Sequence, residues 1–278
     1  MILDGKKISD NIKEELKRRI MVLESKPKLV VILVGENDAS KVYVRNKIKA
    51  CEKIGIDSEV ILFDEKVSEE DLINKIHSLN IDTEVTGILV QLPLPKHIDE
   101  KKIIMAIDYK KDVDGFSPIN IGRMALNMYS PISCTPKGIV RLLREYNIGV
   151  EGKKITVIGR SNIVGKPLSM LLVNMGATVS ILNSKTPNIE EYTKNSDILI
   201  VAIGNPKFIT SRHIDSCEAI IDVGINRDVN GRLCGDVDFD AVKDKAKFIT
   251  PVPGGVGPMT IAMLMENCVE LKEKYGSF

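Results

Sequence analysis

The sequence has no tryptophan, three histidines and five cysteines among its 278 residues. The cysteines are scattered, odd in number and never spaced as Cys-x-x-Cys, which argues against a disulfide framework and a zinc knuckle. The histidines His77, His97 and His213 lack the spacing of metal ligands, so we expect no metal. This cysteine usage suits a reducing compartment, and we expect the cytoplasm. Cys134 precedes Thr135 and Pro136, which indicates the start of a helix rather than a nucleophile.

Two further features are missing, a long apolar run and an excess of charge. No run approaches the roughly 20 residues of a membrane span, and the first residues lack a basic-then-apolar signal pattern. We therefore expect a soluble protein with no membrane partner. With 39 basic and 38 acidic side chains the net charge is +1, which argues against a nucleic-acid partner. What remains is a chain long enough for two globular domains.

An alternation of apolar strands and amphipathic helices predicts an α/β fold with a mainly parallel sheet. The run 29–34 (LVVILV) is apolar on both faces, as in a central parallel strand. We expect helices over 39–54 and 68–79, and strands over 59–63 and 87–92. Residues 108–123 then interrupt the pattern, and we place a domain boundary near Ile121. The expected domains are residues 1–121 and residues 122–260, with a C-terminal helix, 261–278, packing back on the first.

The second series is predicted to form a Rossmann-like, nucleotide-binding domain. We expect helices over 135–146 and 189–195, and strands over 154–158, 178–182, 198–202 and 219–223. The strand 154–158 runs into Gly159-Arg160-Ser161 and Gly165-Lys166-Pro167, a glycine-cornered turn that opens a helix. Backbone N–H groups at such a helix start can face a phosphate, with the Ser161 hydroxyl as a further donor. The central glycine of the dinucleotide fingerprint is absent, so an ordinary βα turn stays open as an alternative.

The end of the next strand discriminates between the two nicotinamide cofactors. An NAD site commonly places an acidic residue there, on the ribose 2′-hydroxyl. Here the sequence reads Asn183-Ser184-Lys185, and Arg160 stands in the turn. Hydroxyl and cationic groups would accept a 2′-phosphate, which favours NADP over NAD. A solvated loop lysine is the alternative.

The helix 39–54 carries a polar half on its core-facing stripe. Ser40, Tyr43 and Lys47 recur at helical spacing, and Tyr43 and Lys47 lie one turn apart. A lysine drawn toward an apolar cleft can serve as an acid or a base. The stripe alone favours the plainer interpretation, a lysine that extends from the helix edge into solvent.

Two loops could converge on this face, and a third stretch is unusual in composition. Gln91 stands at the end of a buried strand, where ligands of α/β sheets bind. Asp114 offers a carboxylate in a turn, although it could equally cap its own backbone. The stretch 251–260 (PVPGGVGPMT) could bring a rigid backbone close to a flat ligand, or could be a linker between domains.

Six motifs in order along the whole chain carry a resemblance to a known family. They are 40–47 (SKVYVRNK), 91–95 (QLPLP), 111–116 (KDVDGF), 159–167 (GRSNIVGKP), 222–226 (DVGIN) and 253–260 (PGGVGPMT). This set resembles the bifunctional methylenetetrahydrofolate dehydrogenase/methenyltetrahydrofolate cyclohydrolase family of the FolD type.

The resemblance implies a homodimeric enzyme of one-carbon metabolism and purine biosynthesis, with tetrahydrofolate derivatives in a cleft between two domains. It would oxidise 5,10-methylenetetrahydrofolate with NADP and hydrolyse the methenyl product to 10-formyltetrahydrofolate. The resemblance makes Lys47 the acid/base of hydrolysis, tuned by Gln91, with Tyr43 on the folate and Asp114 on the pterin. It further assigns substrate contacts to Ser40, Leu92, Pro93, Pro253 and Gly254, and cofactor contacts to Gly159, Arg160, Ser161, Val164, Gly165, Ser184, Ile225 and Thr135.

Two rival functions remain at this point. One is a relative that kept only the dehydrogenase, and the other is a catalytically silent NADP-binding protein. The polar set Tyr43, Lys47, Gln91 and Asp114 is complete, which argues against both. Asn183 stands where many members carry histidine, so a contact near the adenosine ribose is expected to differ.

Overall fold

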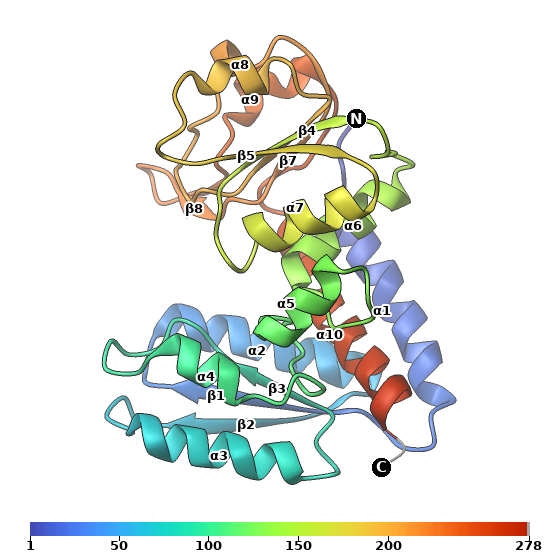
Figure 1. Cartoon of the computed structure of the whole chain (residues 1–278), viewed down its shortest axis with the longest axis vertical. Coiled ribbons are helices and arrows are strands. Elements are labelled where there is room, and N and C mark those ends of the chain that lie inside the picture. Colours follow the sequence, from blue (N-terminus) through green and yellow to red (C-terminus); the bar gives the residue numbers. More distant parts are fainter. Residues whose placement is uncertain (277–278) are drawn as a thin grey trace. The chain divides into compact units, whose positions relative to one another are not determined.

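The computed structural model describes residues 1–276 and divides the chain into two compact units (Figure 1). One, here the three-stranded unit, comprises residues 11–132 and the described residues from 261 onward, 261–276. The other, here the five-stranded unit, comprises residues 1–10 and 133–260. The chain passes from one to the other within helix α1 (Gly5–Met21), after Ile132, and within helix α10 (Val256–Tyr275). Each unit is therefore assembled from two separate stretches of sequence.

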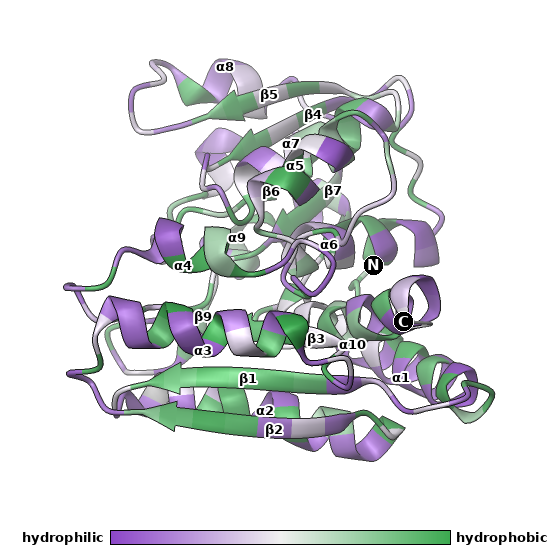
Figure 2. Ribbon diagram, turned by 60° about the horizontal axis from the view of Figure 1, so that its bottom comes forward, coloured by the Kyte–Doolittle hydropathy of each residue, from purple (hydrophilic) through white to green (hydrophobic). Residues whose placement is uncertain are grey.

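The three-stranded unit is built on a parallel sheet in the order β2-β1-β3. Its strands are β1 (Lys28–Val34), β2 (Asp57–Phe63) and β3 (Gly87–Val90). In β1 every residue after Lys28 is buried, which fits its central place and its apolar character along the whole strand (Figure 2). Edge strand β2 is largely exposed.

Helices cover both faces of this sheet. Helices α3 (Glu69–Ile81) and α4 (Glu100–Ala106) pack on the face that holds Val30 and Ile32. Helix α2 (Asp38–Ile54) lies on the opposite face (Figure 1). Its start is fixed by the Asn37 side chain, which accepts a hydrogen bond from the Ser40 N–H, and Ser68 caps α3 in the same way. A short helix, α5 (Pro118–Ala125), follows the turn around Asp112.

The five-stranded unit has an all-parallel sheet in the order β10-β7-β6-β4-β5. Its elements in chain order are α6 (Cys134–Glu145), β4 (Lys154–Ile158), α7 (Gly165–Asn174), β5 (Thr178–Leu182), α8 (Ile189–Thr193), β6 (Ile198–Val201), β7 (Cys217–Asp222), β8 (Asn226–Arg227), β9 (Leu233–Cys234), α9 (Phe239–Val242) and β10 (Ala246–Ile249). After β5 the chain crosses back to the other side of β4 to form β6. The crevice between the carboxyl ends of β4 and β6 is thus the switch point at which such sheets bind ligands.

The predicted fold class is confirmed: the chain has two α/β parts, each with a parallel sheet. The limits 1–121 and 122–260 stay a prediction about domains, while the compact units separate between Ile132 and Ser133. Residues 277 and 278 of the expected C-terminal helix lie outside the described residues.

Some element limits differ from expectation. The last helix already begins at Val256, inside the glycine and proline stretch, because Pro258 falls in its first turn, where a missing N–H is tolerated. Helix α6 begins at Cys134 with Ser133 in the cap position, not Thr135. Helices α4 and α5 were not expected, since each is too short for a periodic pattern to stand out.

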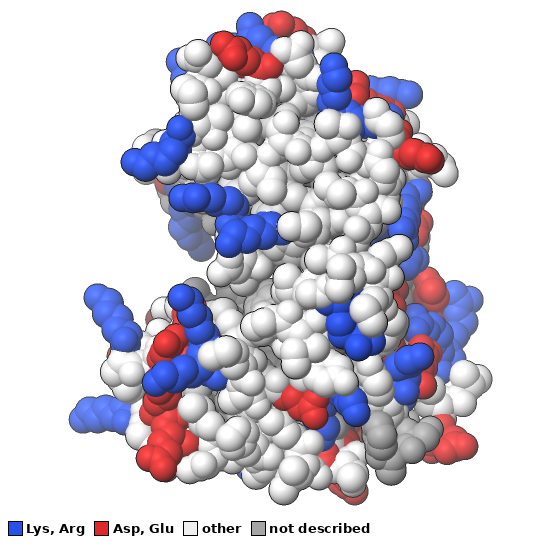
Figure 3. All heavy atoms as spheres, in the orientation of Figure 1, with Lys and Arg blue, Asp and Glu red and all other residues white. Residues whose placement is uncertain are grey.

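Within residues 1–276, no helix combines the length and the apolar character that crossing a membrane requires. In the same range, no three His, Cys, Asp or Glu side chains are grouped so that they could hold a metal ion. All five cysteines are free thiols. Lysines, arginines and carboxylates are interspersed on the face shown in Figure 3, in keeping with the net charge near zero.

Candidate active site and nucleotide site

Lys47 on α2 and Gln91 at the end of β3 meet in the three-stranded unit. The Lys47 Nζ atom donates a hydrogen bond of 3.0 Å to Gln91 Oε1. Gln91 Nε2 in turn donates to the carbonyl of Leu92 at 2.7 Å, which fixes the amide orientation. Lys47 is half-buried and its ammonium is held at the carboxyl end of a buried strand. The structure therefore does not leave this lysine extended into solvent, the plainer interpretation that its helix stripe favoured.

The other polar residues of the α2 stripe differ in exposure. Ser40 is buried in the first turn, whereas Tyr43 is 44% exposed and so available to a ligand. Tyr43 precedes Lys47 by one helical turn, which places the phenol and the ammonium on the same face. Leu92 and Pro93 continue from Gln91 along the same edge of the sheet, Leu92 half-buried and Pro93 exposed.

The turn that carries Asp114 is organised by a second carboxylate, Asp112. Asp112 is buried and accepts hydrogen bonds from the N–H groups of Gly115 (3.0 Å) and Ser117 (2.7 Å) and from Asn120 Nδ2 (3.0 Å). Burial raises the pKa of Asp112 to about 6, against the lowering effect of these donors. Asp114 and Leu92 line one small cavity, so the structure brings these two predicted residues together.

Two asparagines that the sequence interpretation missed hold this turn in place. Asn120 on α5 bridges Asp112 and the carbonyl of Tyr109, and its side chain is fully buried. Asn267 on α10 donates to the carbonyls of Val113 and Ile132, both at 2.8 Å. Nothing in the local pattern around either residue distinguishes it from a surface amide. Asn120 reaches groups eight and eleven residues earlier, and Asn267 acts on backbone groups distant in sequence.

In the five-stranded unit the glycine turn after β4 is closely packed. Gly159 has φ +121°, and a Cβ there would lie 2.2 Å from the carbonyl oxygen of Ala202 at the end of β6. A Cβ on Gly165 would lie 2.1 Å from the carbonyl oxygen of Gly159. The two glycines thus let the turn fold back on itself beside the β4–β6 switch point.

Ser161 satisfies the first N–H groups of α7 itself. Its Oγ accepts from Val164 N at 3.1 Å and from Gly165 N at 3.4 Å. The expectation that these backbone donors face a phosphate therefore needs correction for Val164 and Gly165. The Ser161 hydroxyl hydrogen and the exposed guanidinium of Arg160 can still donate to an anion.

The end of β5 presents the polar turn that favours NADP. Asn183 holds the turn, because its Oδ1 accepts from Lys185 N at 3.0 Å and its N–H donates to Thr186 Oγ1 at 3.0 Å. Ser184 and Lys185 are exposed at its tip. These side chains and Arg160 fit a 2′-phosphate, since all of them donate hydrogen bonds and none adds negative charge.

Two buried aspartates shape the loops on the other side of the switch point. Asp236 accepts from the N–H groups of Ile203, Gly204 and Asn205, directly after β6, and from Asn226 Nδ2. Asp222 accepts from Gly224, Asp236 and Val237, and burial raises its pKa to about 6. Asp236 was not predicted, because its three backbone partners lie more than thirty residues away in sequence and its fourth partner, Asn226 Nδ2, lies ten residues away.

The remaining predicted residues surround the start of α10. Thr135 Oγ1 lies 3.0 Å from Thr260 Oγ1, and Ile225, 52% exposed, has its Cδ1 atom 3.7 Å from the position of a Cβ on Gly257. Pro253 is exposed, and the Gly254 carbonyl accepts from Lys6 N at 3.0 Å. The stretch 251–260 is thus tied to its own unit by these contacts.

Comparison with known proteins places both units in one family. Residues 3–114 match the profile of the tetrahydrofolate dehydrogenase/cyclohydrolase catalytic domain, and residues 133–275 match that of its NAD(P)-binding domain. The chain is 54% identical to the bifunctional protein FolD of Lachnoclostridium phytofermentans over 99% of both chains.

Solved structures agree with these matches. The bifunctional FolD enzyme of Campylobacter jejuni superposes with a TM-score of 0.97 at 48% identity, over 99% of each chain. The Trypanosoma brucei dehydrogenase-cyclohydrolase, solved with NADP cofactor and an inhibitor, gives 0.94 at 35% identity, over 100% of this chain and 99% of that one. The resemblance inferred from six motifs is confirmed, and the chain belongs to the tetrahydrofolate dehydrogenase/cyclohydrolase family.

Proposed function

We infer that the protein is a bifunctional folate enzyme, a methylenetetrahydrofolate dehydrogenase that uses NADP and a methenyltetrahydrofolate cyclohydrolase. Its substrates are tetrahydrofolate derivatives. The match of both family domains and the full-length likeness to bifunctional relatives support this function. The single structural observation that carries it is the hydrogen bond between Lys47 and Gln91, which sets an acid/base group at the end of a buried strand.

Hydrolysis requires water to add to the cationic methenyl carbon and a proton to leave that water. Lys47 Nζ, in its neutral amine form, takes this proton and passes it to the ring nitrogen whose bond to the methenyl carbon breaks as the formyl group forms. The second proton of the added water leaves to solvent. Gln91 accepts a hydrogen bond from Nζ and so fixes its position, which makes Gln91 a positioning residue. A correctly placed acid/base group contributes about 10²–10⁴-fold to such a step.

The residues around Lys47 and Gln91 orient the substrate. Tyr43 offers an exposed aromatic face on the same side of α2, suited to stacking on the folate. Asp114 supplies a carboxylate that can accept hydrogen bonds from the amino group of the pterin. Ser40, Leu92 and Pro93 complete this wall, and Pro253 and Gly254 stay predicted substrate contacts.

For the oxidation, NADP supplies the hydride acceptor when it is bound. Gly159 gives its backbone close access, and Arg160, Ser161 and Ser184 donate hydrogen bonds to its phosphates. The neighbouring Val164, Gly165, Thr135 and Ile225 shape the remainder of this site. The protein residues thus bind and orient, which is what a hydride step mainly requires.

A variant pair tests the role of Lys47. Lys47→Met removes the proton-carrying group and keeps most of the side-chain volume, while Lys49→Met makes the same change at an exposed position of the same helix. We expect Lys47→Met to lower the rate of methenyltetrahydrofolate hydrolysis by about 10²–10⁴-fold. Binding of NADP, followed by calorimetry, should stay unchanged in both variants. Wild-type hydrolysis by Lys47→Met would show that the assigned mechanism is wrong.

Cofactor choice is tested by running the wild-type dehydrogenase with NADP and NAD side by side. We expect the higher kcat/KM with NADP, and Arg160→Gln should raise the KM for NADP about tenfold with little effect on NAD. Arg232→Gln, an exposed change in the same unit, is the control. Equal use of NAD by the wild type would refute the cofactor assignment, and a wild type that oxidises but never hydrolyses would indicate a dehydrogenase alone.

A homodimer formed through the five-stranded unit is part of the proposal. Its edge strand β5 exposes Ile181, and the adjacent helix α7 exposes Met170 and Val173. A second copy would cover these apolar side chains. Light scattering should give twice the chain mass of 30.8 kDa for the wild type and a smaller mass for Val173→Glu.

A further inference from the structure

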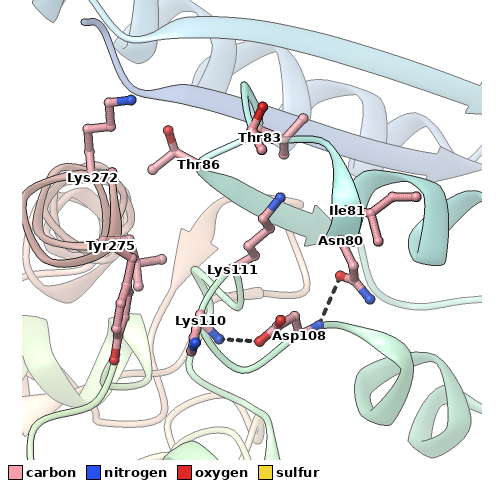
Figure 4. Close-up of a pocket in the computed structure, with 12 residues that line it drawn as sticks. Asn80, Ile81, Thr83, Thr86, Asp108, Lys110, Lys111, Lys272 and Tyr275 are labelled. Carbon is pink, nitrogen blue, oxygen red and sulfur yellow. Dashed lines mark hydrogen bonds between the residues drawn. The ribbon is translucent and has the colours of Figure 1, made fainter. Parts of the chain in front are cut away.

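A cavity in the three-stranded unit lies at the beginning of β3, the opposite end of that strand from Gln91. Its volume is about 190 Å³, and its walls come from the end of α3, the segment 108–111, the loop before β3 and the last turns of α10 (Figure 4). From Thr86 to Gln91 the extended chain covers roughly 16 Å. The cavity is therefore distinct from the candidate active site.

One part of the wall is apolar. Ile81, Val85 and Leu271 line the cavity together with the ring of Tyr275. Engineered apolar cavities of about 150 Å³ bind benzene, so this space can hold a six-membered ring that carries a small substituent.

The other part of the wall is cationic. Lys110, Lys111 and Lys272 all line the cavity, from two different segments. Lys111 is held rigidly, because its Nζ donates to the carbonyls of Leu79 (2.9 Å) and Asp82 (2.5 Å) at the end of α3. Burial lowers the pKa of Lys111, so an anion beside it would replace hydration that the ammonium has lost.

Among the neutral polar groups of the cavity wall, one hydrogen-bond donor is still available to a ligand. Thr86 Oγ1 accepts from Lys28 N at 3.0 Å, which leaves the hydroxyl hydrogen to be donated, and Figure 4 shows Thr86 and Lys272 near the open space. Asn80 is held in place by two bonds, since it donates to Ala106 O and accepts from Asp108 N. Asp108 is the single carboxylate among the described lining residues, and it accepts from Lys110 N at 2.9 Å.

We propose that this cavity is a binding site for a compact organic carboxylate, with a ring-sized apolar body against Leu271 and Tyr275 and its charge toward Lys111 and Lys272. The apolar wall explains why an organic acid is favoured over a bare inorganic anion. The three ammonium groups explain why an acid is favoured over a neutral ring compound of the same size.

The probe is benzoate, with benzamide as a neutral ligand of nearly the same shape. Binding is followed by calorimetry and by chemical-shift changes on the complete protein. Lys272→Gln removes one lining charge, and Lys274→Gln makes the same change two residues along α10, at an exposed position outside the cavity wall. Both variants should keep wild-type dehydrogenase and cyclohydrolase rates.

We expect benzoate to bind at least ten times more tightly than benzamide, and Lys272→Gln to weaken benzoate about three- to tenfold while Lys274→Gln leaves it unchanged. Shift changes should centre on residues 83–86 and 271–275. Three results would each overturn the proposal: no binding of benzoate at millimolar concentration, equal binding of benzamide, or equal binding of benzoate by Lys272→Gln and the wild type. The last result would assign any bound benzoate to another site, such as the folate wall.

Discussion

Replacing Asp236 by asparagine should loosen the loop that follows β6. The Asp236 Oδ2 atom accepts from Ile203 N at 2.7 Å and from Gly204 N at 3.1 Å. The Oδ1 atom accepts from Asn205 N and from Asn226 Nδ2, both at 2.8 Å. An asparagine has one acceptor oxygen and one donor NH₂ group. In either orientation of the new amide, two of the four donors would face another donor.

The size of the effect follows from this count. A hydrogen bond to a charged group contributes about 1.5–3 kcal/mol, so losing two of them costs about 3–6 kcal/mol in free energy of unfolding. Because the side chain is fully buried, water cannot easily replace the lost acceptor. Because the loop can relax, we expect a loss near the lower end of this range, about 3 kcal/mol in free energy of unfolding. This loss corresponds to a fall of about 6–12 °C in melting temperature.

Two measurements test this prediction, thermal unfolding and amide hydrogen exchange at Ile203, Gly204 and Asn205. Exchange at these amides should accelerate, and the KM for NADP should rise, because the loop borders the β4–β6 switch point. The control is Asp240→Asn, which removes the same charge from an exposed residue paired with Lys243 and should change the melting temperature little. A variant of Asp236 with wild-type melting and exchange would refute the role given to this carboxylate.

Two further predictions concern the same kind of buried contact. Burial raises the pKa of Asp112 to about 6 in the fold, above its value of roughly 4 in the unfolded chain, so the folded state binds the proton more tightly. Stability from this group should therefore rise as the pH falls from about 7 toward 4. The rise measured in urea titrations should be smaller in Asp112→Asn than in the wild type, by on the order of 1–3 kcal/mol, with Asp222 supplying the part that remains. Gly235→Ala would place a Cβ 1.8 Å from Asp222 Oδ2 and should cost about 1–3 kcal/mol or more in thermal unfolding, whereas Gly149→Ala, with open space around it, should be neutral or slightly stabilising. Equal melting of these two glycine variants would contradict the packing described around Asp222.

Much of the fold could be predicted because its elements follow local patterns. The apolar run of β1 and the cap at Ser68 each mark an element by short-range chemistry alone. The return of the C-terminal helix to the first part of the chain was expected. The order of the strands and the place of residues 1–10 in the five-stranded unit could not be predicted, because these depend on contacts between residues far apart. The start of α10 was placed too late because proline and glycine usually indicate a loop.

The same distinction holds for the candidate site, where local patterns predicted some residues and long-range contacts determine the others. The spacing of Tyr43 and Lys47 predicted a shared helix face, and the strand end predicted a ligand-facing Gln91, but only the fold shows that Lys47 and Gln91 are bonded to each other. Asp236 and Asn267 were not predicted, because most of their partners are backbone groups distant in sequence. Residues that support a site through such bonds carry no local pattern.

The division of each unit into two stretches affects how the chain folds as it is made. Val113 beside the Asp114 turn is bonded to Asn267, a residue 154 positions later. At about 5–20 residues per second, a ribosome needs roughly 8–30 s to bridge that interval. During this time the whole five-stranded sheet is synthesised, while the turn that carries Asp114 still lacks its anchor. The part of the protein made first is thus completed last, and a nascent chain stalled before α10 would hold the Asp114 turn without the bond from Asn267.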